Sequence, residues 1–314
     1  MGRLTPDEAT ATEPPALLMM AAGVARRYGG GCKPLAPVGL HGEAIIDLTA
    51  GDARRAGFGA VVLVVNPVTG PAIDYHVRRC WPPSMAVAST VQSVPLGTVH
   101  AVLRARPLIG ERPFAVVNAD DIYGTDAMEL LTAHLATAGD HALVSYPLAD
   151  TVVTDDPVTR GVCEVDGQGW LRAVVERRHV ARHRDGRFTA DDGVEPKELA
   201  PDAPVSMNLW GFTPAIWPVL AEALRRVHPE LGADGSVPDG VSPADTEVLL
   251  PEVVGAMAGA PGADRTPGAR VRVIPATGRV VGVTHAEDLP MARTELAEMV
   301  GAGLRPEAPW GDVP

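Results

Sequence analysis

The sequence contains 314 residues, of which 46% are hydrophobic, and carries a formal net charge of −12. A chain of this length and composition can bury the core of one large α/β domain. Its negative charge repels polyanions, which argues against nucleic acid and anionic membrane surfaces as partners, so any phosphate site must be a local cluster of cations.

The N-terminal segment, residues 1–14, combines acids with prolines and lacks the basic and apolar regions of a signal peptide. We expect a flexible tail there. The three cysteines form no CxxC pair, and no apolar run reaches the roughly 18 residues that span a bilayer. These features predict a soluble, cytoplasmic protein with no membrane partner, and they leave open whether it forms a homo-oligomer.

Apolar runs alternate with amphipathic segments through the first half of the chain. The pattern predicts buried strands at residues 16–22, 60–65, 114–118 and 142–146, with helices at 44–56 and 125–138. Continuous apolar runs indicate strands that are covered on both faces. The fold predicted is α/β, with a doubly wound, Rossmann-like, mostly parallel sheet that binds ligands at the carboxyl ends of its strands.

The middle of the chain has a different pattern. Residues 161–165 and 171–176 flank the turn sequence DGQG, which predicts a hairpin and therefore a small antiparallel addition, to which we assign sugar binding. The charged residues 182–204 are expected to form a mobile loop or lid. Further strands are predicted at 205–212 and 271–274, and helices at 214–227, 245–257 and 287–300. We expect one catalytic domain over residues 15–293, followed by the end of a helix and a tail over 294–314.

The segment LLMMAAGVARRYGGGCKPL, residues 17–35, contains the strongest chemical signal. A buried strand leads into a glycine-rich loop, whose backbone N–H groups can line a triphosphate because small residues permit close approach. Lys33 and one of Arg26 or Arg27 would neutralise charge on the α-phosphate and the leaving pyrophosphate. The competing interpretation is an ordinary glycine-rich turn between a strand and a helix.

This segment resembles the signature of the sugar-phosphate nucleotidyltransferases, in which an apolar strand precedes Ala-Gly-x-Gly-x-Arg and Lys-Pro. The resemblance covers roughly residues 17–293. Two features depart from the signature, because Ala25 stands at the second glycine and Gly31 is an extra residue before the lysine. The resemblance implies a triphosphate loop and two catalytic cations at Ala22, Gly23, Ala25, Arg27 and Lys33.

A second motif, FAVVNADDIYG, delivers two carboxylates to the carboxyl end of a buried strand, where acids and substrate phosphates can hold Mg²⁺. The resemblance places the catalytic, metal-binding aspartate at Asp120, while Asp121 alternatively caps the next helix. A second metal ligand is expected at Glu252, in LLPEVVG. Equally, Glu252 is a first-turn acid that the helix dipole favours.

The segment QSVPLGTVHAV resembles the base-recognition stretch of the family. Gln92 would pair with the edge of a pyrimidine and Gly97 would pack on the base. The start of a helix at Thr98 explains the same residues equally well.

Two further segments, RGVCEVD and VVERRH, resemble the sugar-side strands of the family. The resemblance implies that Gly161 contacts the sugar, that Glu176 binds its hydroxyl groups and that Arg177 holds its phosphate. A solvated, charged strand end is the alternative. Asn208 is either another sugar contact or a buried, hydrogen-bonded asparagine.

These residues predict a magnesium-dependent nucleotidyltransferase. It would join a nucleoside triphosphate to a sugar 1-phosphate or a cyclitol phosphate by in-line displacement and release pyrophosphate. Two other functions stay open. A glycosyltransferase would also use a parallel sheet and an acidic metal motif, although a diphosphate donor has little need of the Gly-Arg-Lys loop. A catalytically silent, nucleotide-binding regulatory protein would account for the departures at Ala25, Gly31 and Glu252.

Overall fold

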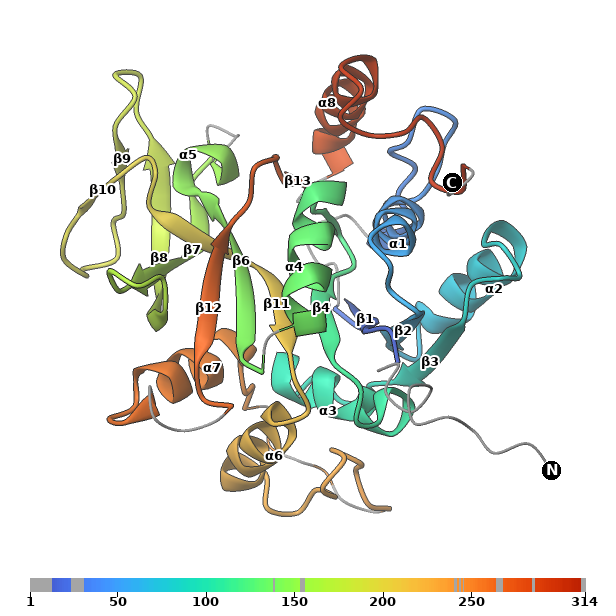
Figure 1. Ribbon diagram of the computed structural model, residues 1–314, viewed down its shortest axis with the longest axis horizontal. Helices are drawn as coiled ribbons and strands as arrows, with labels where there is room; N and C mark the ends of the chain where they lie inside the picture. The colour runs from blue at the N-terminus through green and yellow to red at the C-terminus, as the bar shows by residue number, and fades with distance from the viewer. Residues whose placement is uncertain are drawn as a thin grey trace, which may run out of the picture.

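The protein is described here from a computed structural model (Figure 1). The structure describes residues 13–23, 31–137, 139–152, 156–239, 242, 244, 246–263, 268–283 and 286–311. Among these residues, no helix is both long and apolar enough to cross a membrane.

A mixed sheet of 11 strands forms the centre of the described structure, in the order β10-β9-β8-β7-β11-β4-β1-β2-β3, with β6 beside β11 and β12 beside β6. A short pair, β5 and β13, lies apart from it. The strands are β1 Ala16–Ala21, β2 Ala60–Val65, β3 Val87–Val91, β4 Phe114–Asn118, β5 Asp121–Ile122, β6 His141–Pro147, β7 Val158–Val165, β8 Leu171–Arg182, β9 Phe188–Thr189, β10 Glu198–Leu199, β11 Pro204–Phe212, β12 Val271–Pro275 and β13 Val281–Gly282.

Helices cover both faces of this sheet (Figure 1). They are α1 Ile45–Arg55, α2 Gly70–Cys80, α3 Thr98–Ile109, α4 Thr125–Thr137, α5 Leu148–Thr151, α6 Ile216–Val227, α7 Leu250–Gly259 and α8 Leu289–Gly301, with short 3-10 turns η3 Lys33–Leu35 and η5 Ala286–Asp288.

The parallel half of the sheet contains β3, β2, β1 and β4 in that spatial order. Every residue of β2, sequence AVVLVV, is buried, as expected of a strand that has neighbours on both sides and helices on both faces. The buried strands predicted at 60–65 and 114–118 match β2 and β4. The doubly wound, largely parallel arrangement confirms the predicted α/β class.

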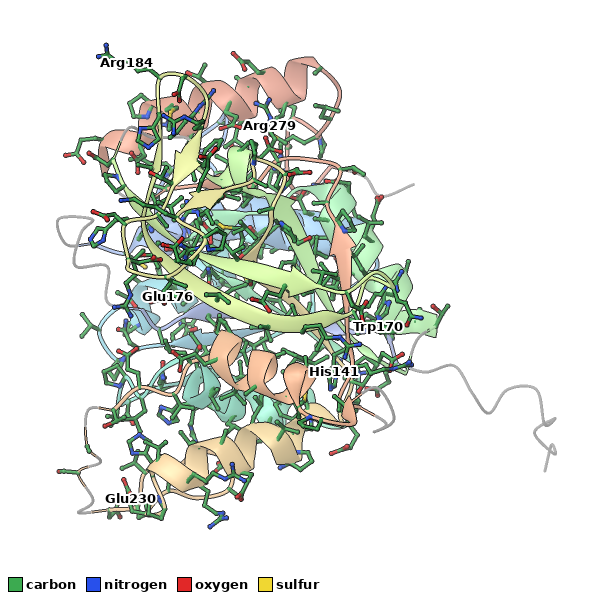
Figure 2. All side chains as sticks on the ribbon, turned by 90° about the vertical axis from the view of Figure 1, so that its left-hand side faces the viewer. His141, Trp170, Glu176, Arg184, Glu230 and Arg279 are labelled. Carbon is green, nitrogen blue, oxygen red and sulfur yellow. The ribbon has the colours of Figure 1, made fainter. Side chains whose placement is uncertain are left out.

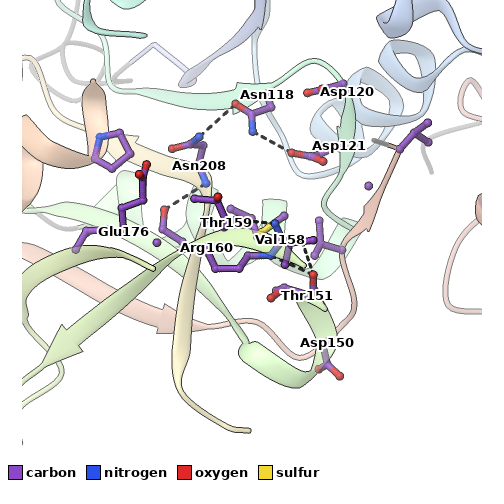
Figure 3. Close-up of a pocket in the computed structure, with 18 of the residues that line it drawn as sticks. Asn118, Asp120, Asp121, Asp150, Thr151, Val158, Thr159, Arg160, Glu176 and Asn208 are labelled. Carbon is purple, nitrogen blue, oxygen red and sulfur yellow. Dashed lines mark hydrogen bonds between the residues drawn. The ribbon is translucent and has the colours of Figure 1, made fainter. Parts of the chain in front are cut away.

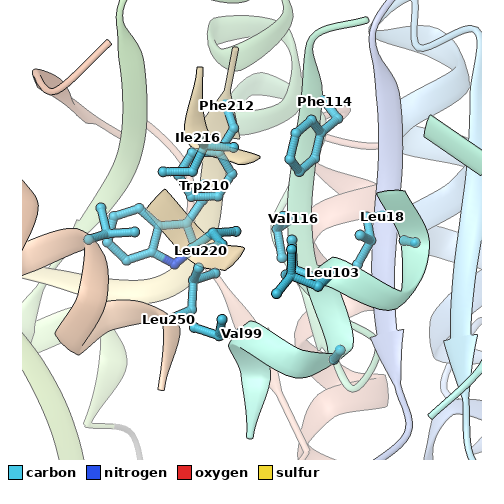
Figure 4. Close-up of a cluster of buried hydrophobic side chains, with 14 of the residues drawn as sticks. Leu18, Val99, Leu103, Phe114, Val116, Trp210, Phe212, Ile216, Leu220 and Leu250 are labelled. Carbon is cyan, nitrogen blue, oxygen red and sulfur yellow. The ribbon is translucent and has the colours of Figure 1, made fainter. Parts of the chain in front are cut away.

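Two hydrophobic cores fill the space between the sheet and its helices. One face packs against α3, α6 and α7, where Phe114 of β4 stacks on Trp217 of α6 with ring centroids 4.5 Å apart. Figure 4 shows how Val116, Trp210 and Leu103 meet in this core. The opposite face packs against α1 and α4. Close packing on both faces fixes the position of the parallel strands, whose carboxyl ends carry the glycine-rich loop and Asp120.

Strand β11 joins the parallel half to the antiparallel half. Along one edge its residues 205–206 pair with β7, and its residues 210–212 pair with β4. Between them the register against β6 shifts, and Asn208 adopts a left-handed backbone with φ 62°. Asparagine tolerates this conformation better than most residues. Because one strand takes two partners in succession, β4 and β7 part at this bulge.

The predicted hairpin forms the antiparallel addition, as β7 and β8 around the DGQG turn. Its turn end is fastened by Trp170, whose ring lies 4.3 Å from the guanidinium carbon of Arg270. Figure 2 looks toward this hairpin, with Trp170 at one end and Glu176 farther along β8. The charged segment 182–204, expected to be a loop, contributes the short strands β9 and β10 to the same edge of the sheet.

Several elements have no counterpart among the predictions, namely α2, β3, the short helix α5 and the two-residue strands β5, β9, β10 and β13. In α2 only Gly70 and Ile73 are buried, and β3 alternates between half-buried and exposed residues at the edge of the sheet. Such segments lack the long apolar run that identifies a core strand or helix. In addition, α7 begins at Leu250, five residues later than predicted.

The residues after α8 pack back onto α1. Arg305 donates to both carboxylate oxygens of Asp52, at 3.1 and 3.0 Å, and both side chains are almost fully buried. Arg55 donates to the carbonyl oxygen of Pro309 at 2.9 Å, and the Trp310 ring lies 5.6 Å from that of Trp81. The C-terminal segment therefore helps to hold α1, which follows the loop that carries Lys33.

The buried His141 at the start of β6 makes the stability of this fold depend on pH. Burial lowers the pKa of its imidazole from 6.5 to about 4. The ring accepts a hydrogen bond from the Thr213 backbone N–H at 3.2 Å, so the neutral form fits the site. Between pH 6.5 and about 4 the unfolded chain binds a proton that the folded chain does not, so the free energy of unfolding falls as the pH falls.

We predict that His141→Asn, which keeps an acceptor but cannot titrate, loses less stability across this interval than the wild type. Urea denaturation at a series of pH values measures this directly. Parallel stability curves for the two proteins would show that His141 does not contribute.

Candidate active site

A cavity of about 620 Å³ opens where β4 and β7 part. Its walls come from the carboxyl end of β4, the β7–β8 hairpin, the bulge of β11 and the start of α7. The structure brings six residues predicted for the site to this cavity, from widely separated parts of the chain: Lys33, Asp120, Gly161, Glu176, Asn208 and Glu252.

Lys33 and Asp120 meet in this cavity, at the carboxyl end of β4. The Lys33 Nζ atom donates to Asp120 Oδ2 at 2.5 Å. Lys33 begins the short turn η3, and Asp120 follows β4 by two residues, so 87 positions of sequence separate them. The lysine side chain is 13% exposed and the aspartate 37% exposed. A cation and a carboxylate are therefore held together at the carboxyl end of β4.

Hydrogen bonds tie the carboxyl end of β4 to the bulge of β11 (Figure 3). Asn118 donates through Nδ2 to Asp121 Oδ2 at 2.9 Å and accepts from Asn208 Nδ2 at 3.4 Å. The buried Tyr123 hydroxyl donates to the Met207 carbonyl oxygen at 2.8 Å and accepts from the Asn118 backbone N–H. This network fixes the two strand ends relative to each other across the cavity.

Asp121 lies beside Asp120 and shares its electrostatic environment. Burial, and after it the charge of Asp120, raises the pKa of the Asp121 carboxyl to about 7. Its carboxylate accepts from Asn118 rather than from the backbone of α4, which begins at Thr125. The structure thus places Asp121 in the wall of the cavity and not at a helix cap.

The acids of this wall suit a hard divalent cation. Asp120 and Asp121 offer carboxylate oxygens at the end of β4, and Glu252 in the first turn of α7 lines the same cavity. Within the described residues, no three His, Cys, Asp or Glu side chains gather into a complete metal cage. This donor set fits Mg²⁺, which keeps several waters and binds one or two carboxylates together with substrate phosphates.

The glycine-rich loop begins at the carboxyl end of β1. Asn66, which follows β2, donates to the Ala22 carbonyl oxygen at 3.2 Å, while its own Oδ1 accepts two backbone N–H groups in the next turn. A side chain at Gly23 would meet nothing within 4 Å among the described residues, so these residues leave the backbone there open to a ligand. The predicted Ala25 and Arg27 lie outside the described residues.

Gln92 and Gly97 lie beyond the part of this cavity that the described residues enclose. The buried Gln92 follows β3, and its Nε2 contacts the Gly97 carbonyl oxygen and His100 Nδ1, each at 3.1 Å. A Cβ atom at Gly97 would stand 2.4 Å from the Val248 carbonyl oxygen, which requires glycine at this close approach. These contacts order the start of α3, and base recognition by the two residues stays a prediction.

The structure separates Glu176 from Arg177. Consecutive residues of a strand point to opposite faces, and Glu176 lines the cavity while Arg177 is 3% exposed on the other side. The Arg177 guanidinium pairs with Asp192 at 2.8 Å and donates to the carbonyl oxygens of Val194 and Pro196. Arg177 is not among the described residues that line the cavity, so we do not propose it as the phosphate ligand.

Arg160, which the sequence analysis did not select, does line the cavity. Arg177 is its partner in the β7–β8 ladder, but the register of the ladder shifts between Val158 and Arg160. At this irregular position the Arg160 side chain reaches the Thr151 carbonyl oxygen at the end of α5, beside the cavity (Figure 3). The sequence held one signal for it, because the motif RGVCEVD begins with this arginine.

The doubly wound sheet, with a lysine–carboxylate cavity at the carboxyl ends of its strands, has the ligand site expected of an α/β domain of this class. The family of MobA-like NTP transferase domains matches residues 17–191, more than half of the chain, and the chain belongs to this family. The resemblance to nucleotidyltransferases predicted from the glycine-rich motif is confirmed.

A curated relative and solved structures are similar to this chain to different extents. The UTP–glucose-1-phosphate uridylyltransferase of Klebsiella pneumoniae is 36% identical over 61 residues, 19% of this chain. The match spans 20% of the length of that curated relative. UDP-glucose pyrophosphorylase complexed with UDP-glucose superposes with a TM-score of 0.61 at 19% identity, covering 90% of this chain and 98% of that one. HddC from Yersinia pseudotuberculosis complexed with GMP-PN gives 0.56 at 14% identity, with coverage of 89% and 98%. At these identities the two structures establish the fold.

The buried ion pair on β8 predicts a stability effect. Arg177→Gln would leave the Asp192 carboxylate without its cation and should lower the thermal midpoint by several degrees. The matched control Arg178→Gln removes an exposed arginine, 68% accessible, from the next position and should change the midpoint little. Differential scanning calorimetry compares the two variants.

Acid should remove this stabilisation. The Arg177 guanidinium holds the pKa of the Asp192 carboxyl well below its ordinary value of 3.8, so the contribution is present above pH 3.8 and is lost as the pH falls further. Equal midpoints for the two variants at neutral pH would contradict the structural role of the pair.

Proposed function

We propose that the protein is a nucleotidyltransferase that joins a nucleoside triphosphate to a sugar 1-phosphate or a cyclitol phosphate and releases pyrophosphate. The observation that carries this proposal is the Lys33–Asp120 pair at the carboxyl end of β4, in a cavity that also contains Glu176 and Asn208. The family of the chain and the uridylyltransferase of Klebsiella pneumoniae support it further. We infer a cytoplasmic role in the synthesis of nucleotide-activated sugars.

In this reaction an oxygen of the acceptor phosphate attacks the α-phosphorus of the triphosphate. The bond from the α-phosphorus to the bridging oxygen of the β-phosphate breaks, and pyrophosphate leaves with that oxygen and its electron pair. Lys33 would stabilise negative charge on the transferring and leaving phosphates. The loop at Ala22 and Gly23 would receive the triphosphate, and Arg27 is the predicted second cation.

Asp120 and Glu252 are the residues that would hold Mg²⁺ in this cavity. The cation, when bound, supplies positive charge that aligns and polarises the phosphates. Lys33 contacts Asp120 at 2.5 Å, so the lysine can balance the carboxylate and turn toward a phosphate once both substrates bind. Removing the side chain of Lys33 or of Asp120 should therefore impair the positioning of the phosphates as well as the stabilisation of their charge.

The acceptor would occupy the antiparallel side. Gly161 lies opposite Glu176 in the β7–β8 ladder. A Cβ atom at this position would stand 3.0 Å from the Val174 side chain, so glycine leaves space beside Glu176 that a larger residue would fill. Glu176 and Asn208 offer an acceptor oxygen and an amide to sugar hydroxyl groups. Gln92 and Gly97 are the predicted contacts of the base, with a pyrimidine preferred. Pyrophosphate release across a grid of the five common triphosphates and a panel of sugar and cyclitol phosphates would identify both substrates.

We predict that Lys33→Ala and Asp120→Asn each lower turnover by about 100-fold or more while the protein stays folded, because each removes a charge aimed at the reacting phosphates. The chain offers a matched control, since it has only one other lysine. Lys197 is 63% exposed on the β9–β10 segment and pairs with Asp191, so Lys197→Ala should keep the wild-type rate. Near wild-type turnover in Lys33→Ala or Asp120→Asn would refute the assignment of the site.

A further inference from the structure

Arg160 occupies an unusual position for a charged side chain. It projects from β7 into the cavity wall, half-buried, near the end of α5 and on the same side of the cavity as Asp121, which follows β4 (Figure 3). Burial lowers the pKa of its guanidinium, and the charge of Asp121 opposes that effect. The guanidinium therefore lies within electrostatic reach of the catalytic wall.

The donors of Arg160 are only partly used. Its Nε donates to the Thr151 carbonyl oxygen at 3.1 Å, and one N–H of Nη2 donates to the same oxygen. One N–H of Nη1 donates to the Thr159 carbonyl oxygen at 2.8 Å. A guanidinium has five N–H groups, so two stay without a partner among the described residues, one on each terminal nitrogen. N–H groups on the two terminal nitrogens of a guanidinium can bind a tetrahedral anion through two hydrogen bonds.

No carboxylate among the described residues lies within ion-pair distance of Arg160, although acids surround the cavity. The described cations that line the cavity are Lys33 and Arg160. Lys33 is already paired with Asp120, and Arg177 is committed to Asp192 on the other side of β8. Neutral backbone carbonyl oxygens instead hold the Arg160 guanidinium in place. Its positive charge is therefore not balanced by a paired carboxylate. Such a group is preorganised for an anion that arrives with the substrate.

We propose that Arg160 binds the phosphate of the acceptor and so determines that the acceptor is a phosphomonoester; this inference rests on the function proposed above. A phosphomonoester has three terminal oxygens. One of them attacks the α-phosphorus, and the remaining two match the two unpartnered N–H groups of Arg160. Arg160 thereby orients the attacking oxygen toward the Lys33–Asp120 side of the cavity, and the phosphate site lies on β7 instead of at Arg177 on β8.

The test compares Arg160→Gln, Arg160→Lys and a control, Arg187→Gln, which removes an exposed arginine at the far end of the same antiparallel addition. Glucose 1-phosphate and UTP are the first substrates. Arg160→Gln should raise the KM for the sugar phosphate by about 10- to 100-fold, since charged hydrogen bonds of this kind are lost, and leave the KM for UTP unchanged. Arg160→Lys, which keeps the charge without the fork, should lie between it and the wild type, and the control should match the wild type.

A binding measurement separates failure of this inference from failure of the proposed function. Inorganic phosphate is titrated into each protein by calorimetry, with thermal midpoints recorded to check folding. Loss of phosphate binding in Arg160→Gln supports the site even where no acceptor in the panel reacts. Unchanged phosphate binding, or an unchanged KM for the sugar phosphate in an active enzyme, overturns it and leaves the nucleotidyltransferase assignment standing. If Arg160→Gln does not fold, the same criteria apply to Arg160→Lys.

Discussion

The site depends on one constraint, the change of partner along a single edge of β11. Its first residues pair with β7 and its last with β4, and the Met207–Asn208 bulge between them absorbs the mismatch. Because β4 belongs to the doubly wound half and β7 to the antiparallel hairpin, the two strands diverge from this point. The cavity occupies the resulting gap, and the bonds of Asn118 to Asp121 and Asn208 hold its edges.

This architecture divides the chemistry between two walls. The parallel half supplies Lys33 and Asp120, which suit phosphates and a divalent cation. The antiparallel half supplies Glu176, Gly161 and Arg160, which suit hydroxyl groups and an anion. Each wall is stiff for its own reason, one through burial on both faces and the other through its ladder and the carbonyls that hold Arg160. In the proposed reaction each wall would receive one of the two substrates.

The sequence predicted most of the parallel half, because β2 and β4 are continuous apolar runs with helices between them, and their carboxyl ends must share one edge. It placed Asp120 at the end of one such strand, and it selected Lys33 from the glycine-rich loop and its resemblance to the nucleotidyltransferase signature. It missed α2 and β3, which bury little, and it paired Glu176 with Arg177 although neighbouring strand residues face opposite ways. The positions of Arg160 and Asn118 depend on contacts with Thr151 of α5 and Asn208 of β11, which no local sequence pattern encodes.

The central claim is that the cavity transfers a nucleotidyl group to a phosphorylated acceptor. The most direct measurement follows a radiolabel on the α-phosphate of UTP in the presence of glucose 1-phosphate and Mg²⁺, with the other common triphosphates and acceptors tested in the same way. The account predicts that the label moves into a nucleotide sugar while unlabelled pyrophosphate is released, and only when both substrates are present. Label that stays in the triphosphate with every acceptor, or leaves as free nucleotide without an acceptor, would contradict it.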